Sequence, residues 1–272
     1  MRALLLPLII VAVAWPAGPA AAAPPRGFIK GIALGMYADI KPRAMDAKLD
    51  EVKALGVDHV SIVVSWSSRD VRSSTIAPRK DYTTDDKVLA RMIKQAHDKG
   101  LKVFLFPILD IRRRKPLEWR GTLKPGNWNT WWANYRRFIV HYGRLAAATR
   151  TELFCVGSEL VTTEKMRGRW KALIGAVRRV YRGKLVYSAN WDHYRPPVFW
   201  DLVDVVGLTG YYKLATTNDA GVAEMRASWR KVRARLEAWS RAIGRRFIFT
   251  ELGYPSMDGT AVNPWDYTLT QR

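Results

Sequence analysis

The feature that most constrains the fold of this chain is an alternation of short apolar runs with longer amphipathic segments, which begins at residue 28. This alternation is typical of a parallel sheet wrapped in helices, because each buried strand needs a helical connection back to the start of the next strand. Helices are expected near residues 43–55, 84–99, 128–149, 165–181 and 219–243. Seven runs are candidate strands, at residues 28–36, 59–66, 102–109, 153–159, 184–191, 204–212 and 246–251.

Four glycines stand where these helices should stop, and we expect them to act as C-terminal caps: Gly56, Gly100, Gly183 and Gly244. The segment "PPVFWDLV" (196–203) is a candidate for a further short helix. No linker rich in proline or serine and no internal repeat divides residues 27–272. We therefore predict one domain over that range.

Two α/β architectures fit the pattern, an open doubly wound sheet and a closed barrel. The phosphate-binding fingerprints of the open sheet, G-x-G-x-x-G and G-x-x-x-x-G-K-[ST], do not follow the first strand. Nearly every candidate strand instead ends in a polar or aromatic group, and a barrel gathers such ends around one mouth. The pattern therefore favours a (β/α)₈ TIM barrel. The strand-end residues are Trp66, Asp110, Glu159, Asn190, Trp191, Asp192, Tyr211, Tyr212 and Glu251.

Two of the strand ends carry glutamates, Glu159 in "FCVGSEL" and Glu251 in "FIFTELGYPS". In a barrel the fourth and seventh strands face each other across the mouth. Two carboxylates about 5 to 5.5 Å apart are the equipment of a retaining glycosidase, one as nucleophile and one as acid and then base. A tyrosine of the sixth strand is well placed to donate a hydrogen bond to Glu251. The alternative for each glutamate alone is a strand-end charge that meets water.

Twelve tryptophans are many for 272 residues, and flat indole rings bind the apolar faces of sugars. Trp66, Trp119 and Trp191 are candidate sugar platforms, and Asp110 and Asn190 are candidate polar contacts to the substrate. The tryptophans inside the expected helices are better explained as packing against strands: Trp131, Trp132, Trp170, Trp229 and Trp239.

The first residues, "MRALLLPLIIVAVAW", have the layout of a secretory signal peptide, with small residues and prolines following the apolar run. We expect cleavage near Ala22, so that residues 1–22 are removed and the protein is periplasmic or secreted. An uncleaved membrane anchor is disfavoured because Pro7 and Pro16 interrupt the run. The single cysteine, Cys155, permits no intrachain disulfide and lies inside a candidate strand, where we expect it in the core.

The formal charge of +21 suggests electrostatic association with an anionic envelope or polysaccharide. Charge alone also allows nucleic acid as a partner, but we expect no specific nucleic-acid binding. In residues 230–246 the arginines alternate with apolar residues at helical spacing, which indicates the solvated face of an amphipathic helix. The four histidines show no metal-ligand spacing, so we expect neither metal nor cofactor, and we expect a monomer.

Seven segments resemble the conserved blocks of glycoside hydrolase family 113, a family of clan A barrels that includes β-mannanases. They are "KGIALGM", "FPILDIRRRKPLEWRG", "WNTWWANYRRFI", "FCVGSEL", "YSANWD", "VGLTGYY" and "FTELGYPS". The resemblance covers essentially all of the chain after the signal peptide. It implies that Glu159 is the acid/base and Glu251 the nucleophile, with Tyr211 or Tyr212 as the partner of the nucleophile.

The chain departs from the clan pattern in two places. Ser158 stands where clan A enzymes usually have an asparagine that holds the sugar 2-hydroxyl; serine can still hydrogen-bond but reaches less far. The segment "NPWDYTLTQR" (263–272) reads as the start of the seventh helix. We therefore expect a barrel truncated before its eighth strand, which in this clan often carries an aromatic floor for the sugar.

From these features we expect an exported, retaining β-glycoside hydrolase that acts on a β-linked polysaccharide such as β-mannan. The alternative is a non-catalytic, envelope-associated carbohydrate-binding barrel, whose cleft has lost activity because Ser158 replaces asparagine and the eighth strand is missing.

Overall fold

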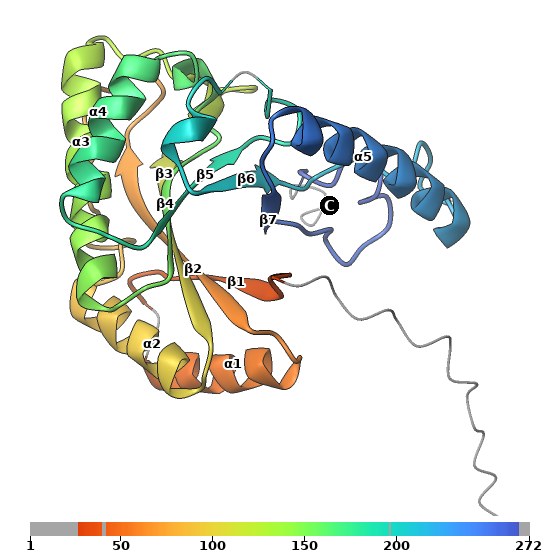
Figure 1. Cartoon of the computed structure of the whole chain (residues 1–272), viewed down its shortest axis with the longest axis horizontal. Helices are drawn as coiled ribbons and strands as arrows, with labels where there is room; N and C mark the ends of the chain where they lie inside the picture. The colour runs from red at the N-terminus through yellow and green to blue at the C-terminus, as the bar shows by residue number, and fades with distance from the viewer. Residues whose placement is uncertain (1–26, 40–41, 196, 267–272) are drawn as a thin grey trace, which may run out of the picture.

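The computed structural model describes residues 27–39, 42–195 and 197–266, so the signal peptide expected at residues 1–22 lies outside the described part. Seven parallel strands form one sheet in chain order, each hydrogen-bonded to the next along the chain. The sheet curls, and the helices lie around its outside (Figure 1). This is the strand order and packing of the predicted (β/α)₈ barrel type. The strands are β1 (Gly31–Gly35), β2 (His59–Ser68), β3 (Lys102–Ile111), β4 (Leu153–Ser158), β5 (Lys184–Ala189), β6 (Val205–Thr209) and β7 (Phe247–Glu251).

In the described ranges, five α-helices connect the strands, close to their expected positions: α1 (Pro42–Ala54), α2 (Asp86–Asp98), α3 (Trp128–Ala148), α4 (Arg167–Arg178) and α5 (Val222–Ala242). Side chains cap two of the helix starts. Asp85 accepts hydrogen bonds from the backbone N–H groups of Lys87 and Val88, and Asn127 accepts one from Thr130. Such caps satisfy N–H groups that have no partner inside the helix.

The short helix expected at 196–203 is, over the described residues 197–203, a single 3₁₀ turn, η3 (Trp200–Leu202). The expected start of a helix in "NPWDYTLTQR" is not helical over residues 263–266, and the rest of that segment lies outside the described residues. Within the described part of the chain, no helix combines the length and the apolar character needed to cross a membrane.

The helical tryptophans pack into the core, as predicted. Trp131, Trp132, Trp170 and Trp239 are buried, and Trp229 is partly buried against the same cluster. Trp170 projects from α4 into the core, with its ring stacked on Phe199 at a centroid distance of 4.6 Å. Cys155 is likewise buried in the core, and burial raises the pKa of its thiol well above the usual range.

Three of the four glycines expected to cap helices have the left-handed backbone that such caps need, with φ of 70° at Gly56, 71° at Gly100 and 63° at Gly244. The prediction for Gly183 is wrong. Helix α4 ends at Arg178, and Gly183 does not have a positive φ. It lies beneath the ring of Tyr181, in space that a side chain would need, so its small size serves packing instead.

Two strands carry an irregularity within three residues of a glutamate. The β4–β5 register shifts between Cys155 and Gly157, which leaves Val156 as an extra residue in β4. The β6–β7 register shifts between Leu208 and Thr209, which leaves Thr250 as an extra residue in β7. Irregularities of this kind re-aim the side chains that follow them. The two strand ends that bear Glu159 and Glu251 are therefore both offset from a regular ladder.

Gly157 in β4 should tolerate no side chain. A Cβ built there would lie 2.7 Å from Trp170, 3.0 Å from the Tyr135 hydroxyl and 3.1 Å from Tyr187, all of which are buried. We expect Gly157→Ala to lower the free energy of unfolding by about 1 to 3 kcal/mol, measured by urea denaturation, because the surrounding rings must shift. Gly175→Ala is the matched control. Its added Cβ meets nothing within 4 Å in the middle of α4, so it should stabilise by roughly 0.5 to 1 kcal/mol. Equal effects of the two substitutions would contradict the packing argument.

Candidate active site

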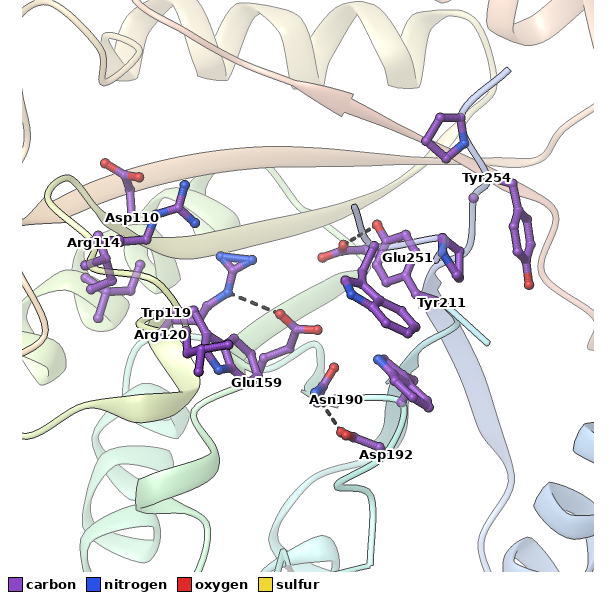
Figure 2. A pocket seen from close by; sticks show the side chains of 18 residues that line it. Asp110, Arg114, Trp119, Arg120, Glu159, Asn190, Asp192, Tyr211, Glu251 and Tyr254 are labelled. Carbon is purple, nitrogen blue, oxygen red and sulfur yellow. Dashed lines mark hydrogen bonds and ion pairs between the residues drawn. The ribbon is translucent and has the colours of Figure 1, made fainter. Parts of the chain in front are cut away.

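A cavity of about 980 Å³ opens at the carboxyl ends of the strands. Figure 2 shows side chains from several strand ends pointing into it. Its walls come from the ends of β3 to β7, from the loop that follows β3, and from the segment after β7. This is the face where a parallel barrel collects the residues that follow its strands.

Glu159 is the first residue after β4, and its backbone has the left-handed φ of 55° that is uncommon outside glycine. Its N–H donates to the carbonyl of Ser188 in β5 at 2.8 Å. The residue is only 7% exposed, and its Oε2 accepts a hydrogen bond from Nε of Arg120 at 3.3 Å. Arg120 begins the 3₁₀ turn η1 (Arg120–Thr122) in the loop after β3. The carboxyl of Glu159 is therefore held in the cavity by a guanidinium from a different strand connection.

Glu251 is the last residue of β7 and enters the same cavity. Its Oε2 accepts a hydrogen bond from the hydroxyl of Tyr211 at 2.8 Å. Its Oε1 is buried and has no hydrogen-bond partner among the described residues. One oxygen of this carboxyl is thus fixed, while the other is left without a protein contact.

A pair of hydroxyls connects the two glutamate positions. The hydroxyls of Ser188 and Thr250 lie 2.6 Å apart in the interior. Ser188 accepts the backbone N–H of Glu159, and Thr250 directly precedes Glu251. Strand β6 lies between β5 and β7, and Gly207 in β6 leaves the room for this contact, because a Cβ there would be 2.7 Å from Thr250. The backbone beside one glutamate is therefore tied to the backbone beside the other.

The electrostatics of the site depend on the carboxyl groups of Glu159 and Glu251 and on the guanidinium of Arg120. Burial raises the pKa of the Glu251 carboxyl and the charge of Glu159 adds to this, whereas Arg120 and the hydrogen bond from Tyr211 act to lower it. Burial acts to lower the pKa of Arg120, but its attraction to Glu159 and Glu251 raises the pKa overall. Arg120 therefore stays charged and serves as counter-ion to both carboxyls. Burial and the charge of Glu251 raise the pKa of Tyr211, so Tyr211 remains a hydrogen-bond donor.

Four further residues expected to contact a substrate line the cavity: Asp110, Trp119, Asn190 and Trp191. Asp110 accepts a hydrogen bond from the Ser67 hydroxyl at 2.9 Å. The Asn190 amide donates to Asp192 at 2.8 Å and accepts from Thr209 at 3.3 Å, so its orientation is fixed. The polar groups of this wall are held in place before any ligand arrives.

Three expected contacts do not line the cavity: Trp66, Ser158 and Tyr212. Side chains alternate between the two faces of a strand, so Trp66 points outward from β2, where it stacks on Phe138 of α3 at 5.3 Å. Its neighbour Ser67 points inward and bonds to Asp110. The two tyrosines that follow β6 also differ, because Tyr211 lines the cavity while Tyr212 is buried outside it.

The expectation for Ser158 is corrected for a related reason. It is the last residue of β4, it is 3% exposed, and its hydroxyl has no partner among the described residues. The adjacent Glu159 occupies the position that opens into the cavity. Ser158 is therefore in the core of the barrel and not on the cavity wall.

Four more residues line the cavity although no sequence pattern singled them out: Arg114, Arg120, Tyr254 and Trp265. Arg120 follows Trp119 directly, but nothing local distinguishes it among 45 lysines and arginines. Trp265 lies flat against Trp191, with centroids 5.2 Å apart and the rings 14° from parallel, and it comes from a segment with no strand or helix pattern. Trp265 therefore covers one face of Trp191, which leaves less of that indole for a ligand than the sequence suggested. Among the residues the structure describes, no three His, Cys, Asp or Glu side chains cluster closely enough to hold a metal ion.

Comparisons with known proteins agree on one family. Residues 34–272 match the model of Glycoside Hydrolase Family 113. Among solved structures, this chain is similar to a β-mannanase of that family from Alicyclobacillus acidocaldarius, in complex with ManMIm. The identity is 27% and the TM-score 0.79, over 89% of this chain and 76% of that one.

Two further solved structures of family 113 β-1,4-mannanases, one of them a complex, are 26% and 27% identical to this chain. Both give a TM-score of 0.77 and cover 88% of this chain and 77% of their own. A search among curated proteins gave no significant match.

The hydrogen bond from Tyr211 should hold down the pKa of Glu251. Since the hydroxyl donates to the ionised carboxylate, Tyr211→Phe should raise this pKa by about one unit or more, followed by ¹³C NMR of the glutamate carboxyls. Tyr254→Phe is the control, because Tyr254 also lines the cavity but donates to the backbone carbonyl of Tyr212. It should leave the titration of Glu251 unchanged. A fall in the pKa of Glu251 in Tyr211→Phe would show that the bond favours the protonated form.

Proposed function

This chain belongs to glycoside hydrolase family 113, and we propose that it cleaves a β-linked mannan by a retaining mechanism in which Glu251 is the nucleophile and Glu159 the acid and then the base. The observation that carries the proposal is the burial of both glutamates in one cavity, each with its own hydrogen-bond donor and both near one charged arginine. Two carboxyls at opposite strand ends can act on opposite sides of a glycosidic bond.

In the first step, Oε1 of Glu251 attacks the anomeric carbon and the bond from that carbon to the leaving oxygen breaks. Glu159 gives its proton to the leaving oxygen, so the released sugar departs with a neutral hydroxyl. The assignment of Oε1 follows from its lack of a protein partner, because Oε2 is held by Tyr211.

In the second step, Glu159 takes a proton from a water molecule while the water oxygen attacks the anomeric carbon. The bond between that carbon and Oε1 of Glu251 breaks, which restores the carboxylate and leaves Glu159 protonated for the next cycle. Two inversions give a product that keeps the β configuration.

The proposal sets a requirement on the surroundings of Glu251. A nucleophile must be ionised, yet burial raises the pKa of this carboxyl. Arg120 and Tyr211 are the two groups that oppose this effect. We therefore expect the acid limb of kcat/KM to lie above the usual range of a glutamate, and to move to higher pH when either group is removed.

β-Mannan is the proposed substrate because the similar solved structures are β-mannanases. Trp119 supplies an apolar surface to a sugar ring, and Asp110 and Asn190 supply polar groups to its hydroxyls. Export rests on the sequence of residues 1–22, and association with an anionic envelope rests on the net charge of +21. We propose both export and envelope association. Fractionation of the native cells, with the protein followed in each fraction, tests where the protein is located.

The two glutamates should respond differently to substitution. Glu159→Ala should form the glycosyl-enzyme from an activated aryl β-mannoside, whose leaving group needs little protonation, but should turn it over slowly, because the base is gone. Added azide should speed turnover and give the β-azide. Glu251→Ala should lack the intermediate and yield the α-azide if azide rescues it. The products are read by NMR, with wild type as control.

Swapped stereochemistry in the two variants would exchange the two roles. Hydrolysis of glucan, xylan or galactan but not mannan by the wild type would replace the proposed substrate. Binding without hydrolysis of any of the four glycans would favour the non-catalytic carbohydrate-binding barrel.

A further inference from the structure

A third glutamate lies close behind the active site, and the proposed mechanism does not use it. Glu164 follows the 3₁₀ turn η2 (Val161–Thr163), five residues after Glu159, and is 0% exposed. Its Oε2 has no partner among the described residues. An unpaired carboxylate is costly to bury, so a glutamate in such a place calls for a physical explanation.

The backbone around Glu159 needs support. A left-handed residue other than glycine costs on the order of 1 kcal/mol or more and persists only where the surroundings hold it. The N–H of Leu160 donates to the Tyr187 hydroxyl at 3.2 Å, and the carbonyl of Leu160 accepts the N–H of Thr163 at 2.8 Å. Leu160 is therefore bonded on both sides.

The Tyr187 hydroxyl connects this backbone to Glu164. It accepts the N–H of Leu160 and donates its own proton to Oε1 of Glu164 at 2.7 Å. Tyr187 is fully buried on β5, with its ring edge-on to Trp170 at 5.0 Å and to Phe199 at 4.9 Å. Because packing fixes the ring, the hydroxyl is a rigid anchor for the segment that carries Glu159.

We propose that Tyr187 and Glu164 are positioning residues, which hold Leu160 and thereby keep Glu159 in its left-handed conformation at the cavity. This inference rests on the role proposed above for Glu159. The relay runs from the Leu160 N–H through the Tyr187 hydroxyl to the Glu164 carboxyl. A phenylalanine at 187 would leave the Leu160 N–H and the Glu164 carboxyl without their partner.

The carboxyl of Glu164 is a neutral acid at neutral pH. Burial raises its pKa to about 8; the Tyr187 hydrogen bond acts to lower it, and Glu159 and Asp192 act to raise it. Three titratable groups act on the Glu164 carboxyl: Tyr187 of β5, Glu159 after β4 and Asp192 after β5. The turn η1 packs against η2, and its Arg120 pairs with Glu159. Since the pKa is higher in the folded than in the unfolded chain, Glu164 costs stability as pH rises from the usual glutamate range to about 8.

The role in positioning is tested with Tyr187→Phe. Misplacing the acid should lower kcat on a mannooligosaccharide, which has a poor leaving group, by about tenfold or more. Formation of the glycosyl-enzyme from an activated aryl mannoside should change much less, and azide should speed its turnover. Tyr181→Phe is the matched control, since Tyr181 is buried and its hydroxyl donates to the carbonyl of Thr151, away from Glu159. Any change in rate caused by Tyr181→Phe should be the same for poor and for activated leaving groups.

Glu164→Gln provides a second test, which does not depend on activity. The amide oxygen can still accept the Tyr187 hydroxyl, so this variant should keep its activity. The side chain of Glu164→Gln does not titrate, so the melting temperature of this variant minus that of wild type should increase from pH 5 to pH 8.

Two results would overturn the inference. One is an equal loss by Tyr187→Phe on poor and activated leaving groups, which would show a general packing role. The other is a loss of kcat in Glu164→Gln as large as that in Tyr187→Phe, because the amide oxygen still accepts the Tyr187 hydroxyl. A constant difference in melting temperature between Glu164→Gln and wild type across that pH range would overturn the assignment of a neutral carboxyl to Glu164. If wild type cleaved no glycan, the proposed function would fail with the positioning role, while the melting series would still decide the state of Glu164.

Discussion

Burial of two carboxyl groups in one cavity, with a single guanidinium as their shared counter-ion, is the interaction on which the rest of the site depends. Without a positive charge, two buried carboxylates would repel each other and neither would ionise readily. Arg120 contacts Glu159 directly and lowers the pKa of Glu251 through space. The 3₁₀ turn after β3 is therefore as much a part of the site as the strand ends that carry the acids.

The scaffold fixes these acids by departing from regular geometry where they occur. Val156 and Thr250 are extra residues in β4 and β7, and Glu159 has a left-handed backbone. The contact between Ser188 and Thr250, across Gly207, ties the two irregular strand ends together. Local strain persists only where many contacts hold it, and the buried hydroxyls and aromatic rings behind the cavity supply those contacts.

The same arrangement sets stability against function. Burial raises the pKa values of Glu251 and Glu164, so each ionised form costs folding free energy as pH rises above the usual glutamate range. For Glu251 the ionised form is the one that the proposed nucleophile needs. For Glu164 the neutral form is sufficient, because the inferred role is to accept one hydrogen bond from Tyr187. Burial of Glu251 therefore opposes the ionisation that its proposed role needs, whereas burial of Glu164 does not oppose its inferred role.

The sequence by itself determined the order of strands and helices and placed Glu159 and Glu251 at strand ends, because apolar runs and helical periodicity are local properties that parallel topology brings to one mouth. The tertiary structure alone decided which of two neighbouring residues faces the cavity. Ser67 faces the cavity side and Trp66 the helices, and Tyr211 lines the cavity while Tyr212 is buried away from it, since the curl of the sheet sets which side of each strand end turns toward the cavity. Only the tertiary structure also showed which of the 45 lysines and arginines is the counter-ion of the two glutamates. Arg120 lies in a loop 39 residues before Glu159 in the chain, and no local sequence pattern indicates that the two side chains meet.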